Sequence, residues 1–357
     1  MFLIILVAFF SLIALVVLHE LGHFLLAKKF GVKVEEFGIG YPPRIFGKKL
    51  GETIYSLNLL PFGAFVKIYG HEERIQDSRS FSTKPIWQRA LVILGGVISF
   101  WIVAAILLTI VMALGVPTMI SDDESRDLVD PKVQIVAVVS DSPAGQAGLK
   151  IGDVVRKIQN QDISKVKELQ EFIETNKGNE IIFGIQRGKE MIDISIVPRE
   201  FYPEDQGATG IALVRTALES YPWYQAPIKG ITATWNLTLM ILDGWKMTFS
   251  SLFSGDGVPD GVEVRGIVGI FELFVQAGGL GISYFLQFIA IISVSLALIN
   301  ILPIPALDGG WFMLLMIEKF RGKPINQKTE QIISSFFFIL LIGLMLWVTV
   351  KDIIRIF

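Results

Sequence analysis

Long uncharged stretches dominate this chain and alternate with shorter polar segments. Four of the stretches are long enough to cross a hydrocarbon core of about 30 Å as helices. The predicted spans are residues 1–30, 86–116, a segment within 273–307, and 331–350. The third stretch is too long for one straight span, and Pro303 and Pro305 interrupt it. The pattern therefore predicts a membrane protein with about four transmembrane helices.

The sequence between the first two spans predicts β-structure. Residues 52–60 and 63–70 are rich in β-branched and aromatic side chains and are bounded by Gly and Pro, as is typical of short strands. Strands beside a membrane must pair their backbone groups, so we expect a small membrane-associated β-sheet. Its edge is either a peptide-binding edge or part of a structural flap. The candidate peptide-binding residues are Gly63, Ala64, Phe65 and Val66.

A second type of pattern follows the second span. Residues 133–198 alternate apolar and polar positions and contain one amphipathic helix near 165–175, which predicts a compact α+β domain. Further on, Trp223, Trp235 and Trp245 stand among polar residues, which favours an amphipathic helix in the membrane interface. A fifth span is the alternative, although Asp243 and Lys246 interrupt it. The predicted parts are a membrane core over 1–120, an inserted domain over 121–216, an interfacial region over 217–279 and a second membrane core over 280–357.

Composition supports this organisation. Apolar residues make up 52% of the chain and charged residues 18%, and the mean hydropathy is +0.56. These values are typical of a polytopic membrane protein. The net charge of −2 argues against a nucleic-acid partner. The absence of cysteine excludes disulfides and thiolate ligands.

Basic residues predict the orientation of the chain in the membrane. They are concentrated in the loop between the first two spans and in the loop at 319–328, which places both loops in the cytoplasm. The 121–216 domain is then extracytoplasmic, and the inner end of the first span lies near the cytoplasmic surface.

That inner end carries the motif His19-Glu20-Leu21-Gly22-His23. Residues four apart share one face of a helix, so His19 and His23 can bind one Zn²⁺ ion while Glu20 stands beside it as a general base. A chance pattern with a polar anchor is the alternative, but ionisable groups in spans are costly without a function. The third ligand must be a carboxylate or His71. We expect His71 to be an ordinary solvated residue outside the site.

A carboxylate with no charged neighbours in the sequence lies in the third apolar stretch. Asp308 is the only charged residue between Glu272 and Glu318, and it follows the segment Asn300-Ile-Leu-Pro303-Ile-Pro305. A proline in a membrane helix leaves backbone groups without helical hydrogen bonds, and this is tolerated where those groups line a site or a cavity. Zinc held by the two histidines is the partner we expect for Asp308, and a salt bridge to a lysine is the alternative.

These segments together resemble the site-2 protease family of intramembrane zinc metalloproteases. The resemblance rests on His19-Glu20-x-x-His23, the strand from Gly63 to Gly70 and the Asn300-to-Asp308 motif, and Ser142 to Val155 resembles a PDZ domain. It implies that His19, His23 and Asp308 bind Zn²⁺, that Glu20 is the catalytic base, and that Asn300, with Pro303 and Pro305, supports substrate binding. The chain departs from the family where Gly96 and Ser99 replace a Pro and an Asn.

The resulting expectation is hydrolysis of peptide bonds within transmembrane segments, with the lipid bilayer as the surroundings. The resemblance implies a transmembrane protein substrate, already trimmed by another protease, and a bacterial cytoplasmic (inner) membrane. Two other functions fit parts of the pattern: a membrane transporter, which also uses broken helices and buried acids, and an inactive PDZ scaffold. Neither explains why Glu20 stands between the two histidines.

Overall fold

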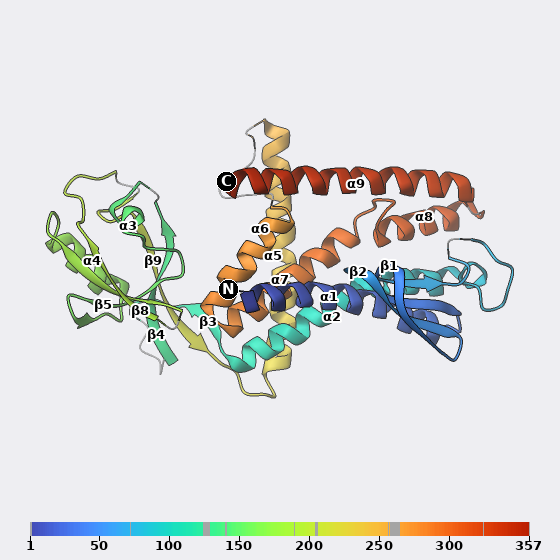
Figure 1. Cartoon of the computed structure of the whole chain (residues 1–357), viewed down its shortest axis with the longest axis horizontal. Coiled ribbons are helices and arrows are strands. Elements are labelled where there is room, and N and C mark those ends of the chain that lie inside the picture. The colour runs from blue at the N-terminus through green and yellow to red at the C-terminus, as the bar shows by residue number, and fades with distance from the viewer. Residues whose placement is uncertain are drawn as a thin grey trace. The chain divides into compact units, whose positions relative to one another are not determined.

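The computed structural model describes residues 2–71, 73–123, 129–139, 141–188, 190–203, 206–255, 257, 265–323 and 325–356 (Figure 1). The chain forms two compact units. The first contains Met1–Ile110, Pro227–Gln276 and Leu286–Phe357, and the second contains Val111–Ala226 and Ala277–Phe285.

The first unit is built on helices with uncharged sequences. Among the described residues, four helices are long and apolar enough to cross a membrane, as the hydrophobic pattern predicted. They are α1 (Phe2–Lys29), α2 (Ile86–Leu114), α7 (Ile282–Asn300) and α9 (Gln327–Ile356). A helix satisfies its backbone hydrogen bonds within the segment, which is the condition for stability in lipid. The chain is thus an integral membrane protein.

Pro303 and Pro305 interrupt the third apolar stretch as expected, and Gly281 adds a break that was not predicted. Helix α6 (Ile267–Leu280) ends before Gly281, whose φ of +121° is a conformation that other residues rarely adopt. Helix α7 then runs to Asn300, and a loop containing Pro303 and Pro305 leads into α8 (Asp308–Arg321). Asp308 is thereby the first residue of a new helix.

Helix α5 (Ala226–Ser254) differs from the four apolar helices. It is not among the candidate spans, and in Figure 1 it runs steeply across the direction of α1 and α9. Small polar side chains such as Thr234 and Thr238 are buried along it, while Trp235 and Leu239 are exposed. This direction is the one expected of a helix lying along a membrane, and its place in the interface remains a prediction.

A close contact between glycines joins α1 to α2. A Cβ atom on Gly22 would overlap the backbone of Gly95, and one on Gly95 would overlap the backbone of Gly22. Small residues at such crossings allow two membrane helices to approach closely. The contact lies one residue before His23 and one residue before Gly96, so it sets the spacing of the two helices at the histidine motif.

Two long strands, β1 (Val34–Leu50) and β2 (Thr53–Ile68), form a small sheet between α1 and α2, where the sequence predicted one. The two short strands predicted at 52–60 and 63–70 are parts of the single strand β2, and its partner β1 lies outside both predicted ranges. Both strands are bent, so that the first half of β1 pairs with two different parts of β2. Phe37 of β1 pairs with Val66 on one side and with Tyr55 on the other, so residues 34–39 are central and residues 64–68 form an edge. No other described strand pairs with this edge.

The second unit is an antiparallel sheet with two short helices. The strands are β3 (Val116–Met119), β4 (Val129–Val138), β5 (Val154–Ile158), β6 (Gln161–Asp162), β7 (Ile181–Arg187), β8 (Glu190–Ile196) and β9 (Ile211–Glu219). Their order is β3-β9-β4-β5-β7-β8, with β6 beside β5. Helix α3 (Pro143–Gln146) is one turn, and α4 (Val166–Thr175) confirms the predicted amphipathic helix. The core of the second unit contains the fully buried side chains of Ile135, Leu169 and Phe183.

Candidate metal site

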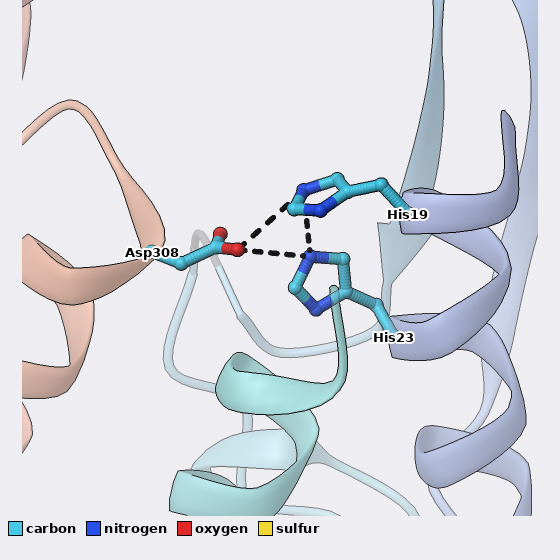
Figure 2. A group of neighbouring side chains, drawn as sticks. All are labelled: His19, His23 and Asp308. Atoms are coloured by element: carbon cyan, nitrogen blue, oxygen red, sulfur yellow. Dashed lines mark hydrogen bonds and ion pairs between the residues drawn. The ribbon is translucent and has the colours of Figure 1, made fainter. Parts of the chain in front are cut away.

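Helix α1 presents the histidine motif on one face. His19 and His23 are buried and lie one helical turn apart, with Glu20 half-buried beside them. Asp308 reaches the same place from the start of α8, although it is separated from the motif by most of the chain (Figure 2). The structure therefore brings together three of the predicted site residues as a cluster, with Glu20 adjacent.

The potential ligand atoms form a nearly equilateral triangle. The Nε2 atoms of His19 and His23 are 3.3 Å apart, and each lies 3.4 Å from Oδ2 of Asp308 (Figure 2). A tetrahedral zinc ion with bonds of about 2.0–2.1 Å separates its ligand atoms by about 3.3 Å. The spacing of the three atoms thus fits zinc with one coordination position left open.

The environment of Asp308 also fits a cation. Its Oδ2 atom is buried and has no well-aligned hydrogen bond, even though two imidazole nitrogens lie nearby. A buried carboxylate oxygen without such a bond carries a cost that a metal ion would remove. The alternative of a salt bridge to a lysine is wrong for the described residues, since the ion pairs of Asp308 are with His19 and His23.

Neighbouring groups on α2 fix the two imidazole rings. Nδ1 of His23 donates a hydrogen bond of 2.8 Å to the backbone carbonyl of Val92, which leaves Nε2 free to face Asp308. The His19 ring stacks on Phe100, with ring centres 4.6 Å apart and planes at 25°. A Cβ atom on Gly96 would overlap both imidazole rings, so glycine is required where α2 passes the cluster.

Glycines and an ion pair hold the start of α8. A Cβ atom on Gly309 would overlap the backbone of Ile301, and one on Gly310 would overlap that of Ile304. Further along α8, Glu318 accepts two hydrogen bonds from the Arg89 guanidinium of α2, with N–O distances of 2.6 and 3.3 Å. These contacts fix α8 to the proline-containing loop and to α2, and so position Asp308.

A cavity of about 150 Å³ adjoins the cluster. Glu20, His23 and Asp308 line it, and so does His71. The expectation that His71 is solvated is wrong, because its ring packs against Phe81 and Trp311 at centroid distances of 4.9 and 4.7 Å. Burial, with a smaller contribution from nearby His23, lowers the pKa of His71 to about 4, so its imidazole is neutral at pH 7.

The edge strand reaches the cavity at two residues, Val66 and Ile68. Val66 lines the cavity together with Glu20. Ala64 is buried, Phe65 stacks on Tyr41, and Gly63 has a φ of +96°. Of the four predicted peptide-binding residues, Val66 is the one placed beside the cluster.

The remaining candidates lie at the end of α7. The Nδ2 atom of Asn300 donates a hydrogen bond of 2.9 Å to the carbonyl of Leu296. Asn300, Pro303 and Pro305 are not among the residues that line the cavity. Pro305 packs against Gly310, so the proline loop supports the turn that carries Asp308.

Replacing Gly96 by alanine is expected to weaken zinc binding about 10- to 100-fold, the usual cost of disturbing groups that orient metal ligands. The added methyl group must displace the His19 or His23 ring. Gly343→Ala in α9, where a Cβ atom meets open space, is the matched control. Competition with a chromophoric chelator measures both affinities. Equal affinities for the wild-type protein and G96A would show that Gly96 does not shape the site.

The chain is similar to known proteins over nearly its whole length. The sequence model of peptidase family M50 matches residues 7–344. A protein of Clostridium perfringens named as a zinc metalloprotease is 34% identical over 343 residues, covering 96% of each chain. The regulator of sigma-W protease RasP of Bacillus subtilis is 28% identical over 425 residues, again covering 96% of each chain. A solved PDZ domain from an SdrC-like protein of Listeria monocytogenes matches 23% of this chain and 85% of its own, with 23% identity and a TM-score of 0.21.

Proposed function

Because the chain belongs to peptidase family M50, the site-2 proteases, and is a membrane zinc metalloprotease, we propose that it hydrolyses peptide bonds within transmembrane segments of other proteins. The observation that carries this proposal is the triangle of His19, His23 and Asp308 beside Glu20. Three of these four groups, His19, Glu20 and His23, belong to α1, a helix apolar enough to cross the membrane. A protease site built into such a helix is suited to substrates that also lie in the bilayer.

In the proposed site, His19, His23 and Asp308 hold one Zn²⁺ ion. Bound there, the ion would supply Lewis-acid chemistry, lowering the pKa of a water molecule toward about 7 and polarising a carbonyl group. The carboxylate of Glu20 takes the proton from the attacking water and delivers it to the leaving nitrogen. The Nδ2 atom of Asn300 has two hydrogens and uses one for Leu296, so one remains available for a substrate carbonyl.

The edge at residues 64–68 is proposed to hold the substrate in an extended form. A transmembrane helix hides its carbonyls in internal hydrogen bonds, so it must unwind before hydrolysis. Added as a further strand, the unwound segment would satisfy its backbone groups and run past Val66 toward Glu20. In this proposal Gly63, Ala64 and Phe65 shape the edge, and Pro303 and Pro305 border the substrate from the α8 side.

The orientation is proposed from the basic loops. With the loops at 30–85 and 319–328 in the cytoplasm of a bacterium, the metal site lies near the inner face of the cytoplasmic membrane. The second unit is then extracytoplasmic and is proposed to be a PDZ-like domain. There it either excludes substrates that another protease has not yet trimmed or binds a free C-terminus.

Metal removal tests the proposed function. Dialysis of the purified protein against a zinc chelator is expected to stop cleavage of a reporter transmembrane segment, and addition of Zn²⁺ is expected to restore it. Addition of Mg²⁺, which prefers oxygen ligands, is the control and should not restore cleavage. Cleavage that persists in the metal-free protein would contradict the proposal.

A further inference from the structure

The cavity beside Glu20 lies next to the proposed reaction centre. Glu20, His23 and Asp308 form one side of it, so a group inside the cavity would lie beside the bond that the site attacks. Its other walls come from β2, α2, α8 and the short 3₁₀ helix at Phe81–Thr83. Segments distant in the sequence therefore build one pocket around the catalytic groups.

The walls away from the cluster are almost entirely apolar. They are formed by Val66, Ile68, Phe81, Val92, Ile93 and Trp311, and His71 is the one polar side chain among them. A volume of about 150 Å³ is large enough for several water molecules. Such waters would find hydrogen-bond partners mainly on the side of Glu20. Six of the ten lining residues are apolar, so the part of the cavity away from the cluster suits an apolar group.

The size of the cavity sets the size of that group. In other proteins an apolar cavity of about 150 Å³ accepts benzene. A leucine, methionine or phenylalanine side chain is of comparable size. An alanine side chain would leave most of the space empty, and a tryptophan side chain would exceed it.

The edge strand indicates how a side chain would enter. Val66 and Ile68 are two residues apart on β2, so they point to the same face of the sheet, and both line the cavity. A substrate strand paired with this edge presents alternate side chains to that face. One of the two residues that flank the scissile bond then points into the cavity, and the other points away.

We propose that this cavity, lined by Val66, Ile68, Phe81, Ile93 and Trp311, is a specificity pocket. It takes a leucine-, methionine- or phenylalanine-sized apolar side chain from one residue adjacent to the scissile bond. This inference rests on the proposed intramembrane protease function and adds a substrate preference to it. The preference is for an apolar residue of intermediate size at one flanking position.

The test is a panel of reporter transmembrane substrates that carry Ala, Leu, Phe or Trp at each flanking position, cleaved by the full-length protein in lipid nanodiscs. At one position, wild-type kcat/KM for Leu or Phe is expected to exceed that for Ala by at least about 10-fold, the discrimination that apolar pockets achieve for small size differences. Ile68→Phe fills the pocket and should shift the preference to Ala. Trp311→Ala enlarges it and should shift the preference to Trp.

Matched controls carry the same changes outside the pocket. Ile45→Phe on β1 and Trp87→Ala on α2 alter side chains that are 63% and 58% exposed and do not line the cavity. Both are expected to keep the wild-type order of substrates. Zinc content is measured for every variant to establish that the metal site is intact.

The outcomes separate the two proposals. Cleavage by wild-type protein with the same substrate order in I68F and W311A would overturn the pocket and leave the protease function standing. No cleavage of any reporter by zinc-loaded wild-type protein would overturn the function itself. If I68F cleaves none of the reporters, the ranking of substrates by W311A tests the pocket: a shift toward Trp supports it, and the wild-type ranking overturns it. Loss of all cleavage in both zinc-loaded variants also counts against the pocket. A residue that only shapes a specificity pocket should change which substrates are cleaved best, and some substrate should still be cleaved.

Discussion

Replacing Glu20 by glutamine is expected to lower the rate of peptide hydrolysis by about 10²- to 10⁴-fold, the usual contribution of a general base. Glutamine has nearly the size of glutamate but cannot accept the proton of the attacking water. The side chain lies beside the cluster, and the triangle of nitrogen and oxygen atoms does not include it. The zinc content of E20Q should therefore equal that of the wild-type protein.

Single-turnover cleavage of a reporter transmembrane segment measures the rate, and metal analysis of the same sample measures zinc. Glu171→Gln is the control, because Glu171 is an exposed side chain on α4 of the second unit, and the cluster belongs to the first. It should cleave at the wild-type rate. If zinc-loaded E20Q cleaved as fast as the wild-type protein, Glu20 would not be the base.

Replacing Asp308 by alanine is expected to weaken zinc binding by about 100-fold or more and to abolish cleavage at limiting zinc. Zinc sites with four ligands bind with about 10–16 kcal/mol, or about 3 kcal/mol for each ligand, and about 1.4 kcal/mol corresponds to a factor of ten. Two histidines one turn apart would remain, and α8 would no longer contribute to the site. Titration with zinc against a chelator gives the affinity.

Asp352→Asn provides a matched control. Asp352 is another buried carboxylate, on α9, and it accepts a hydrogen bond of 2.8 Å from the backbone of Gly269. Its replacement should lower the stability of the protein but leave zinc affinity unchanged. Equal zinc affinity in D308A and the wild-type protein would remove Asp308 from the ligand set. Weakened binding in D352N would indicate that buried charge in general, and not ligation, determines affinity.

Local chemistry in the sequence was sufficient to find the components of the site. His19, Glu20 and His23 follow from helical spacing, because a face of a helix repeats every three to four residues. Asp308 was found because an isolated carboxylate in an apolar stretch needs a partner. The spans follow from length and hydropathy, and the small sheet follows from β-branched and aromatic residues between turn signals.

Contacts between distant segments could not be found in this way. The carbonyl of Val92 orients His23, and His71 packs against Trp311, yet neither pair has a local signal. His71 follows a strand in a polar sequence, so a solvated position was the expectation until packing showed otherwise. Gly95 and Gly96 were a partial signal of a close contact between helices. Glycine inside a helix costs about 1 kcal/mol relative to alanine, so two adjacent glycines indicate a place where another segment comes close to the backbone.

The site is thus assembled from two segments, neither of which contains all of its groups. Helix α1 supplies two imidazoles and the proposed base, and α8 supplies the carboxylate through a turn made possible by Gly309 and Gly310. The Gly22–Gly95 contact and the Arg89–Glu318 ion pair fix both segments to α2. We expect folding of this membrane core and formation of the metal site to be coupled.

Mass spectrometry of the products from a single-span substrate, cleaved by the full-length protein in nanodiscs, tests the central claim most directly. The account predicts one new pair of termini inside the hydrophobic segment, formed by the zinc-loaded wild-type protein and absent with E20Q. Termini found only outside the hydrophobic segment, or formed equally by E20Q, would contradict it.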